Sequence, residues 1–296
     1  MYLTGFADEA SGSIDAQIRA TKELGWKNIE SRGVEGGNIH DIPDESFDKV
    51  CEKLDAAGVK INCFGSAIAN WGKKIDEPFD SSLAEAKRAI PRMQRLGTKL
   101  IRIMSFAVLP DREPDDQMAE ERFKRLRELH KMFTDAGITP VHENCMNYGG
   151  MGYTYTLRLI ENVPGLKLVF DTGNPVCSLD RTKPKPYPTQ SSWEFYSHVK
   201  ENIAYVHIKD ALWDYRENKN KCFTFAGDGE GDVRAIVKDL LDSGYDGGIS
   251  MEPHLAVVFH DKSITSPEEI RYANYVEYGK RFMQLLKDIG HGDKIQ

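Results

Sequence analysis

Four residues that could bind one divalent metal ion are each associated with a short apolar run of the sequence. Glu143, Asp171 and Glu252 each end such a run, and His207 lies within a fourth. Short apolar runs are typical of buried strands, which predicts these side chains at or near the carboxyl ends of four strands. If the four ends converge, three carboxylates and one neutral imidazole bind a dication and leave about one net negative charge.

The ligand types indicate which ions such a site accepts. Carboxylate oxygens and an imidazole nitrogen suit Mn²⁺, Mg²⁺, Co²⁺ or Zn²⁺, and no thiolate restricts the site to zinc. We expect one divalent ion, with Mn²⁺ favoured. The alternative is a hydrogen-bonded polar cluster without a metal. Four ligands on four successive strands favour the metal site.

Five further residues are candidates for substrate contact. Lys209 lies two residues beyond His207 and therefore points to the same side of the strand, where it could hydrogen-bond a substrate oxygen. The alternative for Lys209 is an ion pair with Asp232 or Glu230. The other candidates are Asn174, His254, Trp71 and Arg102. The structural alternative is a cap of the loop for Asn174, a role in loop structure for His254, a buried loop anchor for Trp71, and an outward-facing position for Arg102.

The elements that must position these residues alternate regularly. Strands are predicted at 3–7, 27–31, 60–64, 99–104, 139–144, 166–171, 203–210 and 248–254. Amphipathic helices are predicted between and after them, at 14–24, 47–57, 82–96, 119–136, 153–162, 191–201, 233–243 and 267–289. Strands separated by helices run parallel, and eight such units close into a (β/α)8 barrel. We therefore predict an α/β protein with a single TIM-barrel domain over residues 1–296. An open doubly wound sheet is the alternative, but no glycine-rich dinucleotide-binding turn follows the first strand.

Three connections after strands are long, namely 174–190, 211–232 and 254–266. In a barrel they rise from the carboxyl face, where active sites lie, and we expect them to cover the substrate and set specificity. The alternative is that they form subunit contacts.

Composition excludes several other classes of protein. The formal net charge of −7 disfavours a nucleic-acid-binding surface. No apolar run is long enough to span a membrane, and the first residues lack the basic and apolar regions of a secretory signal. The five cysteines are scattered and odd in number, which favours free thiols over a disulfide framework. We therefore expect a cytoplasmic protein without nucleic-acid or membrane partners.

Four motifs together resemble the xylose isomerase-like TIM-barrel superfamily, and within it the sugar phosphate isomerase/epimerase group, which includes ketose 3-epimerases and inosose dehydratases. They are HEN at 142–144, FDTGN at 170–174, VHIKD at 206–210 and MEPH at 251–254, and the turn GEGD at 229–232 is also similar. The resemblance covers essentially the whole chain. It implies that Glu143, Asp171, His207 and Glu252 bind one divalent ion, and that Glu143 and Glu252 also act as an acid/base pair on a carbohydrate. It further suggests a homo-oligomer, a dimer or a tetramer.

The resemblance implies a mechanism. An ion that chelates a carbonyl and the adjacent hydroxyl acidifies the neighbouring C–H bond and stabilises an enediolate, while two carboxylates deprotonate one face of the sugar and reprotonate the other. We therefore expect a metal-dependent isomerase or epimerase for a ketose or related polyol. Many family members have a histidine three residues after the aspartate. This chain has Asn174 there, which can form hydrogen bonds but cannot take up or release a proton. The alternative is a lyase that dehydrates an inosose or cleaves a 3-keto-glycoside with the same metal and base.

Three more distant alternatives are a sugar-binding barrel without activity, a hydrolase that acts through metal-bound water, and an endonuclease IV-type DNA repair enzyme. The intact ligand set argues against the first. The last belongs to the same superfamily but uses further histidines for three zinc ions. Of the eight histidines here, only His207 falls clearly on that pattern, and the acidic charge also disfavours DNA.

Overall fold

Eight parallel strands form the barrel in the computed structural model, which describes residues 1–258 and 261–295 without the side chains of 220, 221 and 261–264. In chain order the strands are β1 (Tyr2–Gly5), β2 (Asn28–Ser31), β5 (Lys60–Phe64), β6 (Leu100–Ile103), β7 (Thr139–Glu143), β8 (Lys167–Asp171), β9 (Ile203–Ile208) and β12 (Gly248–Met251). Their spatial order is β1-β12-β9-β8-β7-β6-β5-β2. At the seam between β1 and β2, Phe6 and Glu30 form a parallel bridge. The structure therefore confirms the predicted TIM barrel, and the alternative of an open doubly wound sheet is wrong.

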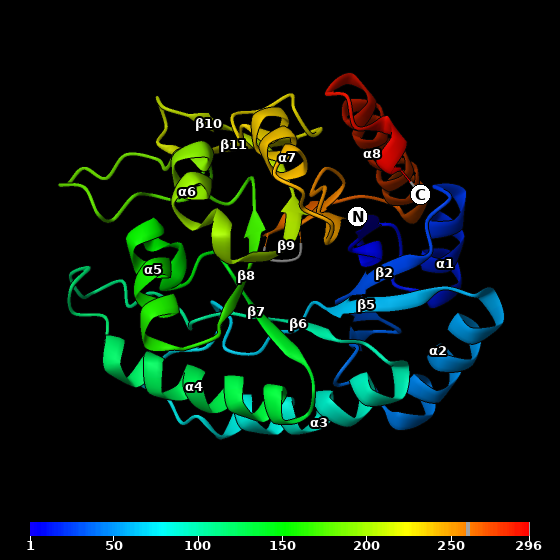
Figure 1. The fold of residues 1–296 in the computed structure, drawn as a ribbon, viewed down its shortest axis with the longest axis horizontal. Coiled ribbons are helices and arrows are strands. Elements are labelled where there is room, and N and C mark those ends of the chain that lie inside the picture. The colour runs from blue at the N-terminus through cyan, green and yellow to red at the C-terminus, as the bar shows by residue number, and fades with distance from the viewer. Residues whose placement is uncertain (259–260, 296) are drawn as a thin grey trace.

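The α-helices surround the strands (Figure 1). Within the described residues they are α1 (Ile14–Glu23), α2 (Asp44–Ala57), α3 (Asp80–Leu96), α4 (Ala119–Asp135), α5 (Tyr153–Asn162), α6 (Ser192–Val199), α7 (Val233–Asp242) and α8 (Glu268–Asp288). Glycines end several of them because the next turn needs positive φ. Gly58 and Gly97 cap α2 and α3 at φ of 66° and 70°. The predicted helices all exist, with ends that differ by at most three residues.

The alternation of side chains along each strand explains the layers of the molecule. Residues on one side of the strands pack against the helices in a large apolar core. On the other side, inside the barrel, a small apolar cluster contains Cys63, Val141, Val169 and Tyr205. The last three precede Glu143, Asp171 and His207 by two residues each, so each pair lies on the same side of its strand. The barrel interior thus has an apolar layer, with a polar layer next to it at the carboxyl ends.

Short antiparallel hairpins extend the connections that the sequence predicts as loops. The connection at 211–232 contains most of β10 (Asp210–Asp214) and all of β11 (Lys219–Thr224), and the one at 254–266 contains β13 (Val257–Val258) and β14 (Asp261–Thr265). A third hairpin joins β3 (Gly33–Val34) to β4 (Gly37–Asn38). Part of the predicted loop, 259–260, lies outside the described residues. The connection at 174–190 has a bridge between Leu179 and Thr189.

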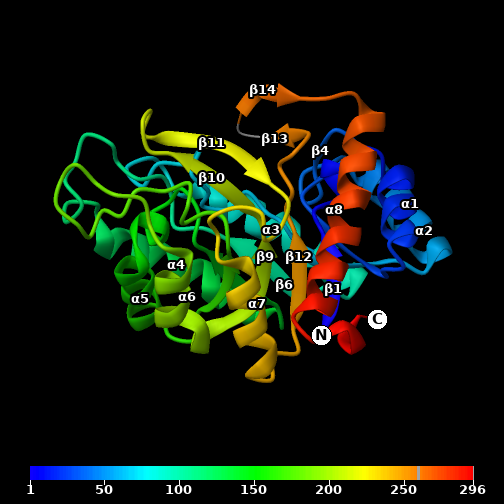
Figure 2. The ribbon, with the colours of Figure 1, turned by 90° about the horizontal axis from the view of Figure 1, so that it is seen from above.

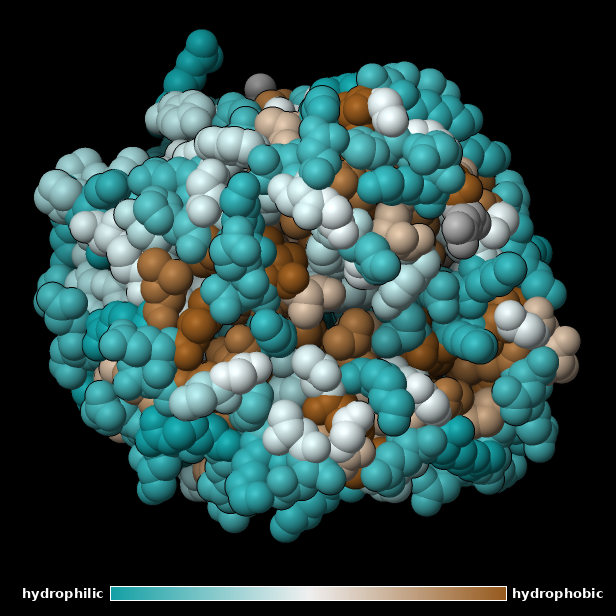
Figure 3. Space-filling view, viewed as in Figure 1, coloured by the Kyte–Doolittle hydropathy of each residue, from teal (hydrophilic) through white to brown (hydrophobic). Residues whose placement is uncertain are grey.

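The hairpins mark one end of the barrel. In Figure 2, β10–β11 and β13–β14 lie at one end of the molecule, and both chain termini lie at the opposite end. The face seen in Figure 3 is mostly hydrophilic, with hydrophobic residues visible around a hollow near its middle. None of the helices in the described residues is both long and apolar enough to cross a membrane.

Candidate metal centre and active site

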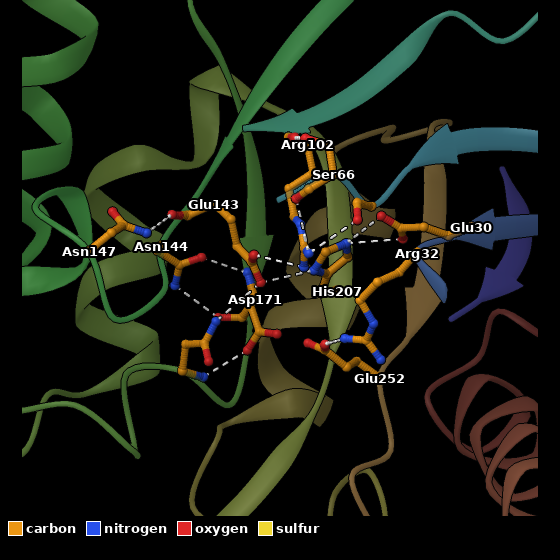
Figure 4. Close-up of polar contacts among 12 residues, drawn as sticks. Glu30, Arg32, Ser66, Arg102, Glu143, Asn144, Asn147, Asp171, His207 and Glu252 are labelled. Atoms are coloured by element: carbon orange, nitrogen blue, oxygen red, sulfur yellow. Dashed lines mark hydrogen bonds and ion pairs between the residues drawn. The ribbon is translucent and has the colours of Figure 1, made fainter. Parts of the chain in front are cut away.

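The structure brings the four predicted ligands together at the carboxyl ends of β7, β8, β9 and β12. Glu143, Asp171, His207 and Glu252 each place one potential ligand atom within 4.8 Å of the others. All four are at most 3 % exposed. Parallel pairing sets Asp171 directly beside His207, and Glu143 and Glu252 approach from the flanking strands (Figure 4).

Buried hydrogen bonds fix Asp171 at both its backbone and its carboxylate. Asn144 continues the pairing of β7 and β8 beyond Glu143, since its amide donates to the Asp171 carbonyl at 3.0 Å and accepts from the Asp171 N–H at 2.7 Å. The Oδ1 atom of Asp171 accepts from the backbone N–H groups of Gly173 and Asn174 at 2.8 and 2.7 Å. These contacts leave Oδ2 of Asp171 directed at the cluster.

His207 lies between two carboxylates. Its Nδ1 atom is 3.2 Å from Oε1 of Glu143, and its Nε2 atom is 3.1 and 3.2 Å from the two oxygens of Glu30. Burial alone would lower the pKa of His207, but the carboxylates of Glu30 and Glu143 raise it to about 10. The metal-free protein therefore holds an imidazolium here, and a metal ion that binds Nδ1 must displace a proton.

Three cations neutralise the carboxylates in the absence of a metal. Arg102 donates to Oε2 of Glu143 at 3.1 Å, and Arg32 donates to Oε1 of Glu252 at 2.6 Å. The ammonium of Lys209 lies 2.9 Å from Oε2 of Glu252 and 3.0 Å from Oδ2 of Asp171. Lys209 therefore lies inside the cluster and does not form the predicted alternative pair with Asp232 or Glu230.

Burial and these cations act against each other on the carboxyl groups. Burial would raise the pKa of Glu143, but Arg102 and His207 lower it to about 2. Burial would also raise the pKa of Glu252, but Lys209 and the other nearby cations lower it well below its ordinary value. Burial dominates for Asp171 and, with the charges of Glu252 and Glu143, raises its pKa to about 6 despite Lys209. Both glutamates are therefore ionised at neutral pH.

The cluster fits a divalent ion on two observations. Ligand atoms that surround one ion at about 2.0–2.2 Å are separated by at most about 4.4 Å, close to the spacing found here. Oδ2 of the fully buried Asp171 accepts no hydrogen bond, although the Lys209 ammonium is near it. A buried carboxylate oxygen without a hydrogen-bond donor is costly unless a cation approaches it. The oxygen-rich donor set suits Mn²⁺ or Mg²⁺ and also accepts Co²⁺ or Zn²⁺.

A cavity of about 230 Å³ opens over this cluster. Glu143 and Glu252 line it, whereas Asp171 and His207 are fully buried and lie outside its lining. All five residues that the sequence nominates for substrate contact line the same cavity, namely Arg102, Lys209, Asn174, His254 and Trp71. Arg102 therefore points into the barrel, and Trp71 is 39 % exposed beside the cavity instead of being a buried anchor. Their contact with a substrate stays a prediction.

Besides Arg102 and Lys209, two more of these candidates lie against Glu143 or Glu252. The Asn174 amide donates to Oε1 of Glu143 at 3.3 Å. His254 has a left-handed φ of 54°, and its Nε2 atom lies 3.7 Å from Oε1 of Glu252. The Nδ1 atom and the backbone N–H of His254 both contact the carboxylate of Glu9, at 2.9 and 2.7 Å.

Sequence reasoning assigned no role to Glu9, Glu30 or Arg32. Glu30 is the penultimate residue of β2 and Glu143 is the last residue of β7, so a strand-end criterion that includes both positions selects Glu30. Glu9 lies in the turn after β1, and Arg32 follows β2 directly. Their link to Glu252 and His254 depends on the closure of the barrel between its first and last strands, which no local pattern reveals.

Solved structures with the same fold include proteins that are named for different activities. A D-tagatose 3-epimerase-like protein matches with 16 % identity over 98 % of each chain and a TM-score of 0.69. A probable 3-DHS dehydratase, AsbF of Bacillus anthracis, matches with 15 % identity over 93 % of this chain and 97 % of that one, with a TM-score of 0.67. A xylose isomerase-like TIM barrel protein of Mycobacterium smegmatis, in complex with magnesium, matches with 19 % identity over 98 % and 97 % of the two chains, also with a TM-score of 0.67. At these identities the likeness shows the fold alone.

The sequence itself matches a family model. No curated protein matches it, but the model described as "Xylose isomerase-like TIM barrel" matches residues 18–272, a range that contains all four clustered residues. The resemblance predicted from the motifs is thus confirmed, and the chain belongs to the xylose isomerase-like TIM barrel family.

Proposed function

We propose that this protein is a divalent-metal-dependent isomerase or epimerase that acts on a ketose or related polyol, with Glu143 and Glu252 as its acid/base pair. One observation carries the proposal. Of the four residues that could hold the ion, the two glutamates also line the cavity. They come from β7 and β12, which β8 and β9 separate, so they can approach a bound sugar from two sides. Asp171 and His207, which do not line the cavity, would serve only as ligands of the ion.

The residues of the chain would divide the work as follows. A divalent ion held by Glu143, Asp171, His207 and Glu252 would polarise the carbonyl and adjacent hydroxyl of the sugar. One glutamate, ionised, removes the proton from the carbon beside the carbonyl, and the other takes up a proton from solvent and donates it to the opposite face. The guanidinium groups of Arg102 and Arg32 fix the two glutamates in position. Lys209 and Asn174 can hydrogen-bond the oxygens of the substrate.

A lyase is the second candidate, and Asn174 is the observation that favours it. The family resemblance leads us to expect a histidine at this position, whereas the amide of Asn174 donates a hydrogen bond to Glu143 but cannot take up or release a proton. Elimination needs one base beside a ketone and a leaving group on the next carbon, so it tolerates this replacement better than a two-sided proton transfer does. The substrates would be keto-sugars, 3-keto-glycosides or inososes.

Solvent isotope exchange tests both versions. Protein loaded with Mn²⁺ would be incubated in D₂O with ketoses, inososes and 3-keto-glycosides, and products would be followed by mass spectrometry and NMR. An epimerase places one deuterium beside the carbonyl with inversion, whereas a lyase releases the β-substituent and gives an unsaturated ketone. Glu143→Gln and Glu252→Gln should lower exchange by about 10²–10⁴-fold, and Glu120→Gln, on the exposed face of α4, should not.

Two results would count against this proposal. Elemental analysis could find no bound divalent metal even after ions are added back, which would remove the electrophile. Alternatively, a sugar could bind with equal affinity to the native protein and to Glu143→Gln without any exchange, which would indicate a sugar-binding barrel without activity. Incorporation of ¹⁸O from water into the product would point to a hydrolase instead.

A further inference from the structure

A second cavity adjoins the one that Glu143 and Glu252 line, and the proposed chemistry gives it no role. Its volume is about 380 Å³, compared with about 230 Å³ for the first. Trp71, Met146 and Cys177 line both cavities, so the two spaces meet at these side chains. A ligand that extended from the metal cluster past Trp71 would enter the second space.

The two cavities differ in chemical character. The first is lined by the charged groups of Arg32, Arg102, Glu143, Lys209 and Glu252. The second is mainly apolar, and among the described residues Arg181 is its one charged lining residue. The reacting part of a substrate, with its carbonyl and hydroxyls, thus belongs in the first cavity. The second cavity suits a neutral group that has apolar faces and also a few hydroxyls. Ser178 and Asn147 could form hydrogen bonds with these hydroxyls.

Hydrogen bonds to backbone carbonyl groups hold the walls of the second cavity in place. The Arg181 N–H donates to the Met151 carbonyl at 2.9 Å, which joins the connection after β8 to the turn after β7. The side chain of Gln190 donates to the carbonyls of Gly150 and Leu179 at 2.8 and 3.3 Å. The cavity is therefore built before a ligand arrives, which lowers the ordering cost of binding.

Two large apolar side chains are exposed where the two cavities adjoin. Trp71 and Met146 are 39 % and 43 % exposed, and they are two of five large hydrophobic residues that are exposed among those described. Exposed apolar surface that borders a polar site is typical of a ligand-binding surface. An indole face and a thioether suit the C–H face of a sugar ring or an aromatic ring.

We propose that the second cavity binds a second ring, joined to the reacting sugar through a glycosidic oxygen, so that the substrate is a glycosylated keto-sugar. This inference rests on the proposed function and names its substrate class. Binding pockets for small ligands usually have volumes of about 300–1,000 Å³. The first cavity alone falls below this range, and the two cavities together fall within it.

Matched ligand pairs test the inference by isothermal titration calorimetry on the Mn²⁺-loaded protein. One set compares fructose with its 3-O-, 4-O- and 6-O-glucosyl derivatives, and another compares methyl 3-keto-β-glucoside with 3-keto-cellobiose and with the phenyl 3-keto-glucoside. Ala107→Phe and Leu179→Trp each fill the second cavity from a different wall. Trp193→Ala is the matched control, because Trp193 is 41 % exposed on α6 and lines neither cavity.

We expect at least one two-ring ligand to bind about tenfold more tightly than its one-ring partner. Both filling variants should abolish this preference, keep the affinity for the one-ring ligand, and unfold at the temperature of the control. A phenyl ring that equals the second sugar would identify an aromatic aglycone as the occupant. Equal affinity for one-ring and two-ring ligands, unchanged by the filling variants, would overturn the inference.

Deuterium exchange on the same samples separates this inference from the proposed function. Exchange into sugars without a preference for a second ring would leave the isomerase or lyase intact and remove the second-ring site. A second-ring preference without exchange for any ligand would contradict the proposed chemistry while leaving the second site as a binding site.

Discussion

Glu30 holds the imidazole of His207 from the side opposite the metal cluster. Both oxygens of Glu30 lie within 3.2 Å of Nε2 (Figure 4). Both side chains are fully buried, and Tyr205 donates its hydroxyl to Glu30 at 3.0 Å. A proton on Nε2 that donates to Glu30 leaves Nδ1, which faces Glu143, as the nitrogen whose proton a metal ion would displace. Nδ1 is therefore the atom of His207 that would bind a metal ion, and Glu30 acts as a positioning residue.

Removal of this carboxylate should weaken metal binding without removing a ligand. We expect Glu30→Leu to lower the affinity for Mn²⁺ or Zn²⁺ by about 10–100-fold. Glu30→Gln should lose less, because its amide oxygen still accepts from Nε2. Competition with a chelating dye measures both affinities, with Glu120→Gln as the control. Equal affinities for Glu30→Leu and the control would show that His207 does not need this partner.

Lys209 should have opposite effects on the metal-free and the metal-loaded protein. Burial would lower its pKa, but the carboxylates of Asp171 and Glu252 hold the pKa well above its ordinary value, so Lys209 is charged. Lys209→Met leaves Asp171 without this cation and Glu252 with Arg32 alone, which should destabilise the metal-free protein by about 3–5 kcal/mol. A divalent ion supplies the missing charge, so the variant should recover most of this loss when Mn²⁺ is added. Urea unfolding in EDTA and in Mn²⁺ measures both values. A loss of the same size in both conditions would contradict the shared-carboxylate geometry.

The main architecture could be predicted because each β/α unit carries its own signals. Runs of five to eight residues rich in apolar side chains predicted the eight strands, and a glycine after helices such as α2 and α3 predicted their ends. The four clustered residues follow from the same logic, since parallel strands bring their carboxyl ends to one face. The hairpin β10–β11 was predicted as part of a loop because β11 begins with a polar run and β10, although mostly buried, has only three apolar residues, between Asp210 and Asp214.

Contacts across the seam of the barrel could not be predicted. Arg32, after β2, reaches Glu252, after β12, although 220 residues separate them. Glu9 and His254 are 245 residues apart. Each of these residues is an ordinary charged side chain in a turn, and only the closed sheet gives it a partner. The same holds for Lys209, for which the sequence offered Asp232 and Glu230 as acids near in the chain.

Asp210 should be essential for the shape of the connection after β10–β11. Its carboxylate accepts from the backbone N–H groups of Gly227, Gly229 and Gly231 at 2.9, 3.0 and 2.8 Å. Asp210→Ala leaves three amides without this acceptor, and we expect a loss of about 3 kcal/mol or more in the free energy of unfolding. Asp210→Asn keeps one acceptor oxygen and should lose less. Chemical denaturation measures the series, and an Asp210→Ala protein as stable as the native one would refute this role.

Gly229→Ala tests the same turn from the other side. A Cβ atom at Gly229 would lie 2.3 Å from Oδ1 of Asp210 and 2.6 Å from the carbonyl oxygen of Ala211. Both are held in place, so the variant must displace the turn and should be destabilised. Gly244→Ala is not a suitable control because Gly244 has a positive φ of 87°. Gly12→Ala is suitable, since nothing lies within 4 Å of its added Cβ.

His40 should make the protein less stable as the pH falls below neutrality. Burial lowers the pKa of His40 to about 4, against the raising effect of Asp41, whereas the ordinary value in an unfolded chain is 6.5. The unfolded state therefore binds a proton between pH 6.5 and 4 that the folded state refuses, and stability rises with pH across this window. His40→Gln removes this titration but leaves the others, including that of Asp171, in place. The difference in unfolding free energy between the native protein and the variant should be constant above pH 7. It should then fall by about 1.4 kcal/mol per pH unit down to pH 4. Urea titrations of both proteins from pH 4 to pH 8 measure this difference, and a difference that does not change with pH would show that the His40 ring accepts a proton in the folded protein.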